Sequence, residues 1–504
     1  MYRKSDPAQM DVYDFVLPFG GHLDKNNRWV KLRKEIDRDI IDEIYSKNFD
    51  NKKTGNEAYP SDLAFGALYI QRTLGCRDRE LVEQIAENPY MQYFIGYKEF
   101  TTEKPFDPSL LVHFRKRLTE EVMNEITSCM FLENDDNDDK NGGSASGGGG
   151  GTIQDAGSDG DAENNGTLII DATCTPADIA FPTDLELCDK ARRWTEVILD
   201  HYWSLYGALE EGNTKPRTYR ETARRRFLTL NKRRRKSKKK IRKEIRYQLN
   251  CIRRNLAYIE NYERKHGLKG LLRIETDRLK TIREFHDQQR HILENKTHQV
   301  KDRIVSLSQP WIRPIVRGKS KAPTEFGAKL SISVVNGYTF LDKLSFDAYN
   351  EGKHEEFVAV MEKYKERYGT YPERVLADKI YRSRDNRRFC REHGIRISGP
   401  RLGRRGSNYR DELQQELKEI GERNAVEGKF GNGKRRLGLG RIMAKLRETT
   451  GSMVAMDLFV MNIEHRMRIC AAFCYEKWRF YVAMMWMEIK VEPVFWQCRM
   501  QGVK

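Results

Sequence analysis

The sequence lacks the cysteine pattern of a zinc site or a disulfide framework. Its nine cysteines are scattered, and none forms a Cys-x-x-Cys pair. Cys470 and Cys474 are four residues apart, but no paired His or Cys spacing completes a metal site with them. The sequence therefore predicts free thiols in a reducing compartment.

Long apolar runs are also missing. The N-terminus shows no secretory signal pattern, and the apolar stretch Phe480 to Met487 is far too short to cross a bilayer. We therefore expect no membrane association and a cytoplasmic location.

Positive charge, by contrast, is abundant and unevenly spread. Lys and Arg number 91 against 74 Asp and Glu, which gives a net charge of +17. Such an excess suits a polyanionic partner, usually nucleic acid. The densest stretch lies between Arg220 and Arg246, where only Glu221 and Glu244 oppose the cations. The cations in this stretch are Arg224, Arg225, Arg226, Lys232, Arg233, Arg234, Arg235, Lys236, Lys238, Lys239, Lys240, Arg242 and Lys243. Such a run predicts a grip on the DNA backbone, with a solvated charged face as the alternative.

The N-terminal part, residues 1–133, is expected to be a helical DNA-binding domain. Apolar periodicity predicts helices from about 28 to 130, one of them capped by Ser61 and ended by Gly75. In the helix after Asp107, the cations Arg115, Lys116 and Arg117 are expected to face largely outward, and Arg115 and Arg117 are candidates for DNA contact. The alternative is a small helical bundle with a solvated basic face.

Residues 134–166 predict a flexible linker, because they hold an acidic run and a Gly/Ser tract with few apolar groups. The following domain, 167–465, reads as a mixed α/β sheet. An apolar strand at 167–171 precedes a basic helical insertion at about 186–322 and a hairpin that turns at Asn336-Gly337. Helices at 353–368, 383–393 and 411–427 then alternate with short strands at 375–378 and 395–398. In the last helix Leu413, Leu417 and Ile420 are expected to face inward.

Three carboxylates are the candidate catalytic and metal-binding residues. Asp171 and Asp378 each end an apolar strand, where α/β proteins place ligands, and Glu427 lies on a later helix. Carboxylates that converge repel one another unless a cation holds them, and magnesium prefers oxygen ligands. From the residues alone, turn or capping roles remain open for the two aspartates.

Three segments around these carboxylates resemble the DDE transposases of bacterial insertion sequences, of the insertion sequence four and five group. The family's Tyr-x2-Arg-x3-Glu-x6-Lys element is matched by Arg423, Glu427 and Lys434, with Ile420 in place of the Tyr. The segments Asp171-Ala172-Thr173 and Ala377-Asp378-Lys379-x-Tyr381, with Asn386 and Arg387 behind, are also similar. So is the N-terminal stretch that includes Phe106-Asp107-Pro108-Ser109-Leu110.

The resemblance implies a ribonuclease-H-like sheet of five strands, in which Asp171 ends the first strand and Asp378 the fourth. It implies two Mg²⁺ ions on Asp171, Asp378 and Glu427, with Mn²⁺ as a substitute, and strand cleavage and transfer at terminal inverted repeats. The implied partners are double-stranded element ends and target DNA, bound by a homodimer assembled on DNA and associated with the nucleoid. A catalytically inactive relative that only binds DNA stays open as the alternative, and a metal-dependent nuclease unrelated to transposition as a weaker one. The tail, 466–504, has no assigned role.

Arg423 and Lys434 are the candidates for contact with the terminal phosphates. On a continuous helix both share a face with Glu427, and cations beside a metal-bound carboxylate call for an anion. Two alternatives are open: Arg423 pairs with Glu419, or the nearby glycines end the helix before Lys434. The stretch from Gly428 to Lys434 imitates a phosphate-binding P-loop, but Arg435 stands where that motif needs Ser or Thr.

Overall fold

The structure is a computed structural model, and it describes residues 13–17, 21–49, 57–132, 163–207, 214–297, 299–316, 324–399 and 409–500. Most of the predicted linker, 134–162, lies outside these residues. The N-terminal part is helical, as predicted, with α1 Arg28–Glu35, α2 Arg38–Ser46, α3 Ser61–Leu74, α4 Asp78–Glu87, α5 Pro89–Phe94, α6 Leu110–Arg117 and α7 Glu120–Leu132.

Helix α3 shows how local sequence sets these elements. Leu63, Ala67 and Ile70 are buried on its inward face, and Gly75 ends the helix with a left-handed φ of 67°. The predicted cap is displaced by one position: Pro60 is the N-cap, and Ser61 is the first helical residue. The Ser61 hydroxyl bonds the buried Asp42 carboxylate instead, at 2.5 Å.

The sheet is mixed and has six strands in the described residues, in the order β2-β3-β1-β5-β6 with β4 paired to β3. The expected count of five is wrong because β2, at Arg313–Val316, forms at the end of what reads as a purely helical insertion. The other strands are β1 Thr167–Pro176, β3 Thr324–Val335, β4 Tyr338–Ser345, β5 Arg374–Leu376 and β6 Arg396–Ile397. The predicted hairpin is confirmed, since β3 and β4 pair across Asn336 and Gly337.

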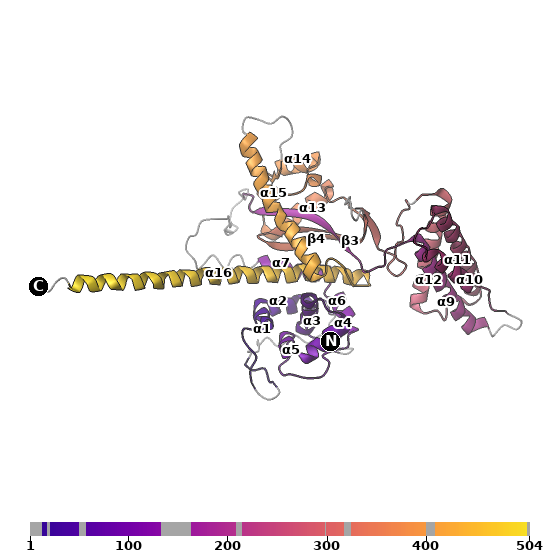
Figure 1. The fold of residues 1–504 in the computed structure, drawn as a ribbon, viewed down its shortest axis with the longest axis horizontal. Helices are drawn as coiled ribbons and strands as arrows, with labels where there is room; N and C mark the ends of the chain where they lie inside the picture. Colours follow the sequence, from indigo (N-terminus) through magenta and orange to yellow (C-terminus); the bar gives the residue numbers. More distant parts are fainter. Residues whose placement is uncertain are drawn as a thin grey trace.

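The insertion folds into a separate helical bundle, which lies to one side of the sheet in Figure 1. It consists of α9 Asp184–Tyr202, the π-helical turn η1 Trp203–Gly207, α10 Arg220–Asn231, α11 Lys238–His266 and α12 Arg273–Asn295. Leu199, Ile252 and Phe285 belong to its own hydrophobic core. The basic stretch is therefore carried by packed helices.

The remaining helices are α13 His354–Tyr368, η2 Lys379–Tyr381, α14 Arg384–Glu392, α15 Tyr409–Asn432, the π-helical turn η3 Gly433–Leu437 and α16 Arg447–Met500. In α15, Leu417 and Ile420 are 61% and 52% exposed, so the predicted inward face is wrong for these two residues. The helix turns Val426 and Phe430 to the core instead.

Helix α16 joins the N-terminal helices to the sheet. Its first part packs against α3, α6 and α7 on one side and β4 on the other, and residues 451–463 are all buried (Figure 1). The rings of Phe65 on α3 and Phe459 on α16 meet edge to face at 5.2 Å. One hydrophobic core therefore runs across the predicted boundary at residue 133, while the domain limits themselves stay a prediction.

The eight cysteines whose side chains the structure describes are free thiols, as expected. Among the described helices none is both long and apolar enough to cross a membrane.

Candidate active site

Asp171 and Asp378 come together through the register of two parallel strands. β1 pairs with β5 only from Thr167 to Ile169, where Ile169 faces Leu376. Two residues further along the same register, Asp171 stands level with Asp378, at the point where the strands part. The sequence predicted that Asp171 ends its strand, and this is wrong. β1 continues to Pro176 because the longer strand β3 pairs with it antiparallel.

Glu427 lies on α15, near the end of the sheet where β1 and β5 part. That helix packs against both β1 and β5 and buries Val426 and Phe430 against the core. Glu427 follows Val426 in sequence and therefore lies about 100° around the helix from it, at the border of the packed face. Its side chain is 62% exposed and that of Asp378 is 55% exposed, so both carboxylates are open to solvent.

The three carboxylates and Arg423 influence one another electrostatically. Burial raises the pKa of Asp171, and the charges of Asp378 and Glu427 raise it further; the Ala172 N–H and Arg423 act in the opposite direction. The Arg423 guanidinium lies 3.7 Å from Asp378 Oδ1 and 4.0 Å from Glu427 Oε1. Excess negative charge at one point is the condition under which a cation binds.

The donor set fits a hard divalent cation in its chemistry, because carboxylate oxygens are the ligands that such ions prefer. Their present spacing is more open than a closed metal site, since no group of three His, Cys, Asp or Glu in the described parts of the chain lies close enough to hold an ion. Arg423 is the cation that stands among them.

The alternative partner of Arg423, Glu419, is engaged elsewhere. Glu419 is buried, forms an ion pair with Arg396 and accepts a hydrogen bond from the Gly399 N–H at 3.2 Å. The helix therefore directs Arg423 to the candidate site and Glu419 to the neighbouring strand β6.

Lys434 reaches the site from beyond the α-helix. The glycine alternative is the one found: α15 ends at Asn432, before Lys434, and a π-helical turn follows. Lys434 Nζ still donates a hydrogen bond of 2.9 Å to Thr173 Oγ1. Thr173 is two residues beyond Asp171 on β1 and so shares its face of the sheet. Thr173 had no predicted role, although the alternation of side chains along a strand places it on the same face as Asp171.

Asn386 holds the turn that carries Asp378. It is fully buried, and its Nδ2 donates to the carbonyls of Tyr381 at 2.8 Å and Gly352 at 3.1 Å. Ser398 Oγ accepts from the Ala377 N–H at 3.1 Å. These contacts fix the backbone on both sides of Asp378 and leave its carboxylate in solvent.

The chain after η3 is tied to the end of β1. The Ile442 N–H donates to Pro176 O at 2.8 Å, and Asp178 forms ion pairs with Arg441 and Lys445. Both cations hold the pKa of Asp178 below its usual range, and the hydrogen bond from Lys445 has the larger effect. The segment with Glu427 and Lys434 is thereby fastened to the strand with Asp171.

Two parts of the chain are similar to known protein families, and one of these parts contains most of the candidate site. Residues 375–464, which include Asp378, Arg423, Glu427 and Lys434, match a family described as "Transposase DDE domain". Residues 18–117 match a family described as "Transposase domain". Both matches are to transposase families, and the match over the candidate site is to a domain of the DDE type.

One curated relative is similar to part of the chain, and its description states no function. The "Uncharacterized protein ORF8 in nfe locus" of Rhizobium meliloti is 28% identical over 142 residues, which are 28% of this chain and 58% of that protein. The matched region therefore spans less than two thirds of that relative. No solved structure was found to match the chain.

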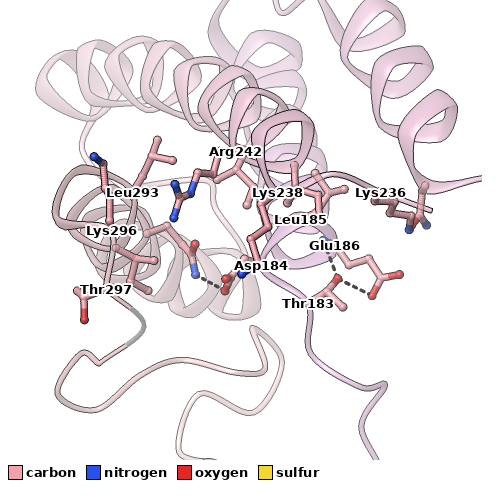
Figure 2. Close-up of a pocket in the computed structure, with 15 residues that line it drawn as sticks. Thr183, Asp184, Leu185, Glu186, Lys236, Lys238, Arg242, Leu293, Lys296 and Thr297 are labelled. Atoms are coloured by element: carbon pink, nitrogen blue, oxygen red, sulfur yellow. Dashed lines mark hydrogen bonds between the residues drawn. The ribbon is translucent and has the colours of Figure 1, made fainter. Parts of the chain in front are cut away.

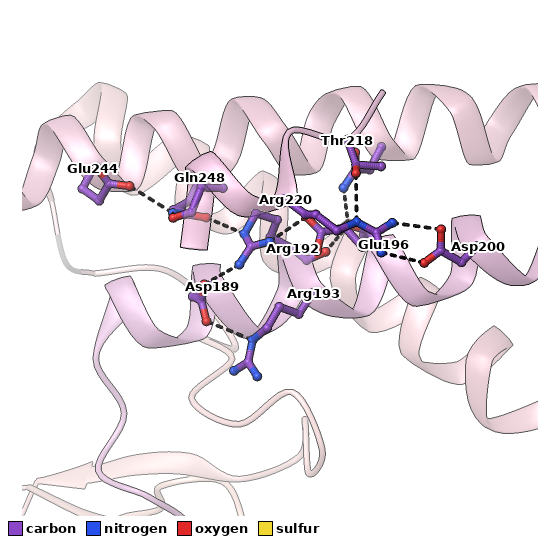
Figure 3. Close-up of polar contacts among 12 residues, drawn as sticks. Asp189, Arg192, Arg193, Glu196, Asp200, Thr218, Arg220, Glu244 and Gln248 are labelled. Atoms are coloured by element: carbon purple, nitrogen blue, oxygen red, sulfur yellow. Dashed lines mark hydrogen bonds and ion pairs between the residues drawn. The ribbon is translucent and has the colours of Figure 1, made fainter. Parts of the chain in front are cut away.

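The basic bundle pairs its buried arginines with carboxylates of its own. Arg192, buried on α9, pairs with Asp189 and Glu196, each at 2.6 Å, and Arg220 pairs with Asp200 (Figure 3). The candidate DNA-binding cations on the outside are all exposed, and within the described residues no carboxylate forms an ion pair with them. They are Arg224, Arg225, Arg233, Arg234, Arg235, Lys236 and Lys239. Among the described residues, these seven cations are therefore not neutralised by an ion pair.

A cavity of about 340 Å³ opens at one end of the bundle, between α9, α11 and α12. Its wall is aliphatic, with Leu185, Ile241 and Ile292 among the lining residues. Lys236, Lys238, Arg242 and Lys296 also line it (Figure 2). These four cations are thus gathered around one opening.

The two N-terminal candidates are placed differently from the prediction. Arg115 is only 6% exposed and pairs with Asp78 at 2.5 Å, while its Nη2 also donates to Gln71 at 2.8 Å. The expectation that it faces solvent is therefore wrong: an arginine so buried needs these internal partners and serves to join α6 to α3 and α4. Arg117 is half-buried, with its guanidinium 4.8 Å from the ring centre of Phe49.

Proposed function

We propose that the protein is a transposase of a bacterial insertion sequence, of the insertion sequence four and five group, that cuts DNA at the terminal inverted repeats of its element and transfers the strands to target DNA. The observation that carries the proposal is the convergence of Asp171, Asp378 and Glu427 on one edge of the sheet. The topology around β1 supports a ribonuclease-H-like arrangement with β2 as an additional edge strand.

In this proposal the three carboxylates hold two Mg²⁺ ions, with Mn²⁺ as a substitute. When bound, such ions supply activation of a water molecule and stabilisation of the leaving 3′ oxygen. The chain's own contribution is positional. Asn386 and Ser398 hold the Asp378 turn, and Lys434 stands beside Asp171 through Thr173, where its ammonium can hold a phosphate of the cut strand.

DNA contact outside the cutting site falls mainly to the basic bundle, because seven of its exposed cations, from Arg224 to Lys239, form no ion pair in the described residues. The N-terminal helices assist in recognition of the repeat ends. The active assembly is a homodimer formed on DNA, with element ends and target DNA as partners. The nucleoid is where such an assembly works.

The test is cleavage of an element end by variants that keep the fold. The wild-type protein, the terminal inverted repeats and Mg²⁺ should generate a new 3′ hydroxyl at the repeat end. Asp171→Asn, Asp378→Asn and Glu427→Gln should each abolish this product and leave DNA affinity unchanged, because they remove charge at the site alone.

Asp385→Asn is the matched control. Asp385 is an exposed carboxylate seven residues after Asp378 that pairs with Arg388 on the surface of α14, so its variant should cleave normally. Normal cleavage by the Asp378→Asn protein would contradict the proposed site. Repeat binding by the wild-type protein without any cleavage would favour an inactive DNA-binding relative.

A further inference from the structure

We propose that Arg423 is an exchangeable cation of the site: in the metal-free protein it neutralises Asp378 and Glu427, and the divalent ions and the DNA phosphate together displace it onto DNA. This inference rests on the proposed function. It assigns to Arg423 a control of metal occupancy in addition to phosphate contact.

The first step of the argument is the position of Arg423. Its guanidinium lies between the carboxylates of Asp378 and Glu427, at 3.7 Å and 4.0 Å, and it acts on Asp171 through its charge. A divalent cation would bind the same oxygens at about 2.0 to 2.6 Å. The guanidinium and the ions therefore compete for one set of ligands.

The second step is that Arg423 is held loosely. Both of its ion-pair distances exceed hydrogen-bond length, so the attraction is electrostatic and has no fixed geometry. The two carboxylates that it pairs with are more than half exposed, which weakens each pair further. A long, partly exposed side chain held in this way can turn toward a new anion at little cost.

The third step is the consequence for binding. Without DNA, Arg423 remains among the carboxylates and lowers the affinity of the site for metal. A DNA phosphate nearby gives the guanidinium a second anion and leaves the carboxylates to the ions. Metal and DNA should therefore strengthen each other's binding, and the coupling should be equal in both directions.

The experiment is Mn²⁺ titration of the full-length protein by calorimetry, with and without a short duplex of random sequence. Without DNA, Arg423→Ala should bind Mn²⁺ about threefold to tenfold more tightly than wild type, because two weak ion pairs no longer compete with the ion. The duplex should raise the Mn²⁺ affinity of wild type and have little effect on that of Arg423→Ala. Cleavage by Arg423→Ala should fall at the same time.

Lys418→Ala is the matched control. Lys418 is exposed on the same helix, five residues before Arg423, and forms no ion pair in the described residues. Its variant removes the same charge at a distance from the carboxylates and should bind Mn²⁺ as wild type does. Arg423→Lys, which keeps the charge, should also stay close to wild type and shows whether the fold tolerates a change here.

The outcomes separate the two proposals. If wild type binds Mn²⁺ and Arg423→Ala binds it equally or more weakly, the exchange is overturned while the metal site stands. If Lys418→Ala tightens binding as much as Arg423→Ala, the effect is one of overall charge and the exchange is again overturned. If neither wild type nor Arg423→Ala binds Mn²⁺, the proposed metal site fails and the exchange fails with it.

Discussion

At the scale of single residues, the candidate site depends on side chains that place other side chains. Thr173 is 5% exposed and accepts a hydrogen bond from Lys434, so an ammonium from beyond α15 is held beside the strand that carries Asp171. Neither residue needs to touch a metal for this arrangement to matter. A shift of about 1 Å in a positioning group can lower a rate by about two orders of magnitude.

We predict a graded loss of cleavage along this contact. Lys434→Ala should slow single-turnover cleavage by about two orders of magnitude, or about 3 kcal/mol, because the phosphate loses its partner. Thr173→Val should slow it by about tenfold, since the ammonium stays but loses its anchor, and Thr173→Ser should restore most of the rate. The measurement is the rate in saturating Mg²⁺ and DNA.

Affinity for Mn²⁺ serves as the control for these variants. A positioning role leaves it unchanged in all three, whereas damage to the site as a whole would lower it. Cleavage by Lys434→Ala at the wild-type rate would exclude a phosphate clamp at this residue.

At the scale of elements, the basic bundle combines a neutral interior with a charged exterior. Its buried arginines are matched by carboxylates, as Arg192 is by Asp189 and Glu196, so the bundle folds without a polyanion. The exposed cations at the start of α11 and just before it have no such partners in the described residues. Their mutual repulsion favours an external anion with closely spaced charges.

We predict that this end of the bundle sets the salt dependence of DNA binding. Each phosphate contact contributes about 0.9 to the slope of log affinity against log salt. Changing Arg233, Arg234, Arg235 and Lys236 together to Gln should therefore flatten the slope by up to about 3 to 4 units. The slope can be measured by fluorescence anisotropy on a labelled duplex between about 50 and 200 mM salt.

The opposite end of the bundle offers a control of equal charge. Arg264, Lys269, Arg273 and Lys280 are exposed and lie in or beside the last turn of α11 and the first turns of α12. Their replacement by Gln should change the slope much less. Equal slopes for both fourfold variants would show that the stretch before α11 does not contact DNA.

At the scale of the whole molecule, α16 makes the N-terminal helices and the sheet depend on each other. Arg72 on α3 pairs with the buried Asp457 on α16 at 2.5 Å and also donates to Leu437 O at 2.5 Å, at the end of the turn that holds Lys434. Burial raises the pKa of Asp457 to about 6 even though Arg72 opposes the rise. Removal of the N-terminal helices would expose this carboxylate and the apolar residues around it. Their role in DNA recognition is therefore better tested by surface substitutions in the full chain.

Glu120 gives this joint a measurable pH dependence. It is the first residue of α7, and its carboxylate lies against α16 at Gly451. Burial raises the pKa of Glu120 to about 7 from 4.5, with a smaller rise from Glu121, while Lys363 lowers it. Between about pH 4.5 and 7, the folded state therefore keeps a proton on Glu120 that the unfolded chain has released. This contribution to stability is complete below about pH 4.5 and is lost as the pH rises through 7.

We predict that Glu120→Gln removes this loss. Between pH 5 and pH 8 the wild-type protein should lose about 1 to 2 kcal/mol from this group, a value reduced for partial exposure, and the variant should not. The measurement is the denaturant midpoint at each pH. Glu121→Gln, at an exposed neighbour that contributes only the smaller rise, should keep most of the wild-type loss. Parallel curves for wild type and Glu120→Gln would contradict the assignment.

Local patterns were sufficient for most of the elements. Periodicity and turn residues predicted the helices on both sides of the sheet, the hairpin at Asn336 and Gly337, and the helical basic insertion. They did not predict β2, because four residues with little pattern become a strand only when β3 lies beside them. The inward face of α15 was also misplaced, since Leu417 and Ile420 follow helical spacing but no element covers them.

The sequence by itself determined which residues are candidates at the site, because Asp171, Asp378 and the Arg423, Glu427 and Lys434 spacing can be read along the chain. Only the tertiary structure decided how they meet. A parallel register places Asp171 level with Asp378, α15 directs Arg423 to the carboxylates and away from Glu419, and Thr173 receives Lys434. The physical reason is that strand register and helix packing are set by contacts between segments that are far apart in the sequence. Arg115 is an example: its basic neighbours predicted an exposed side chain, but it is buried and forms an ion pair with Asp78, which lies 37 residues earlier.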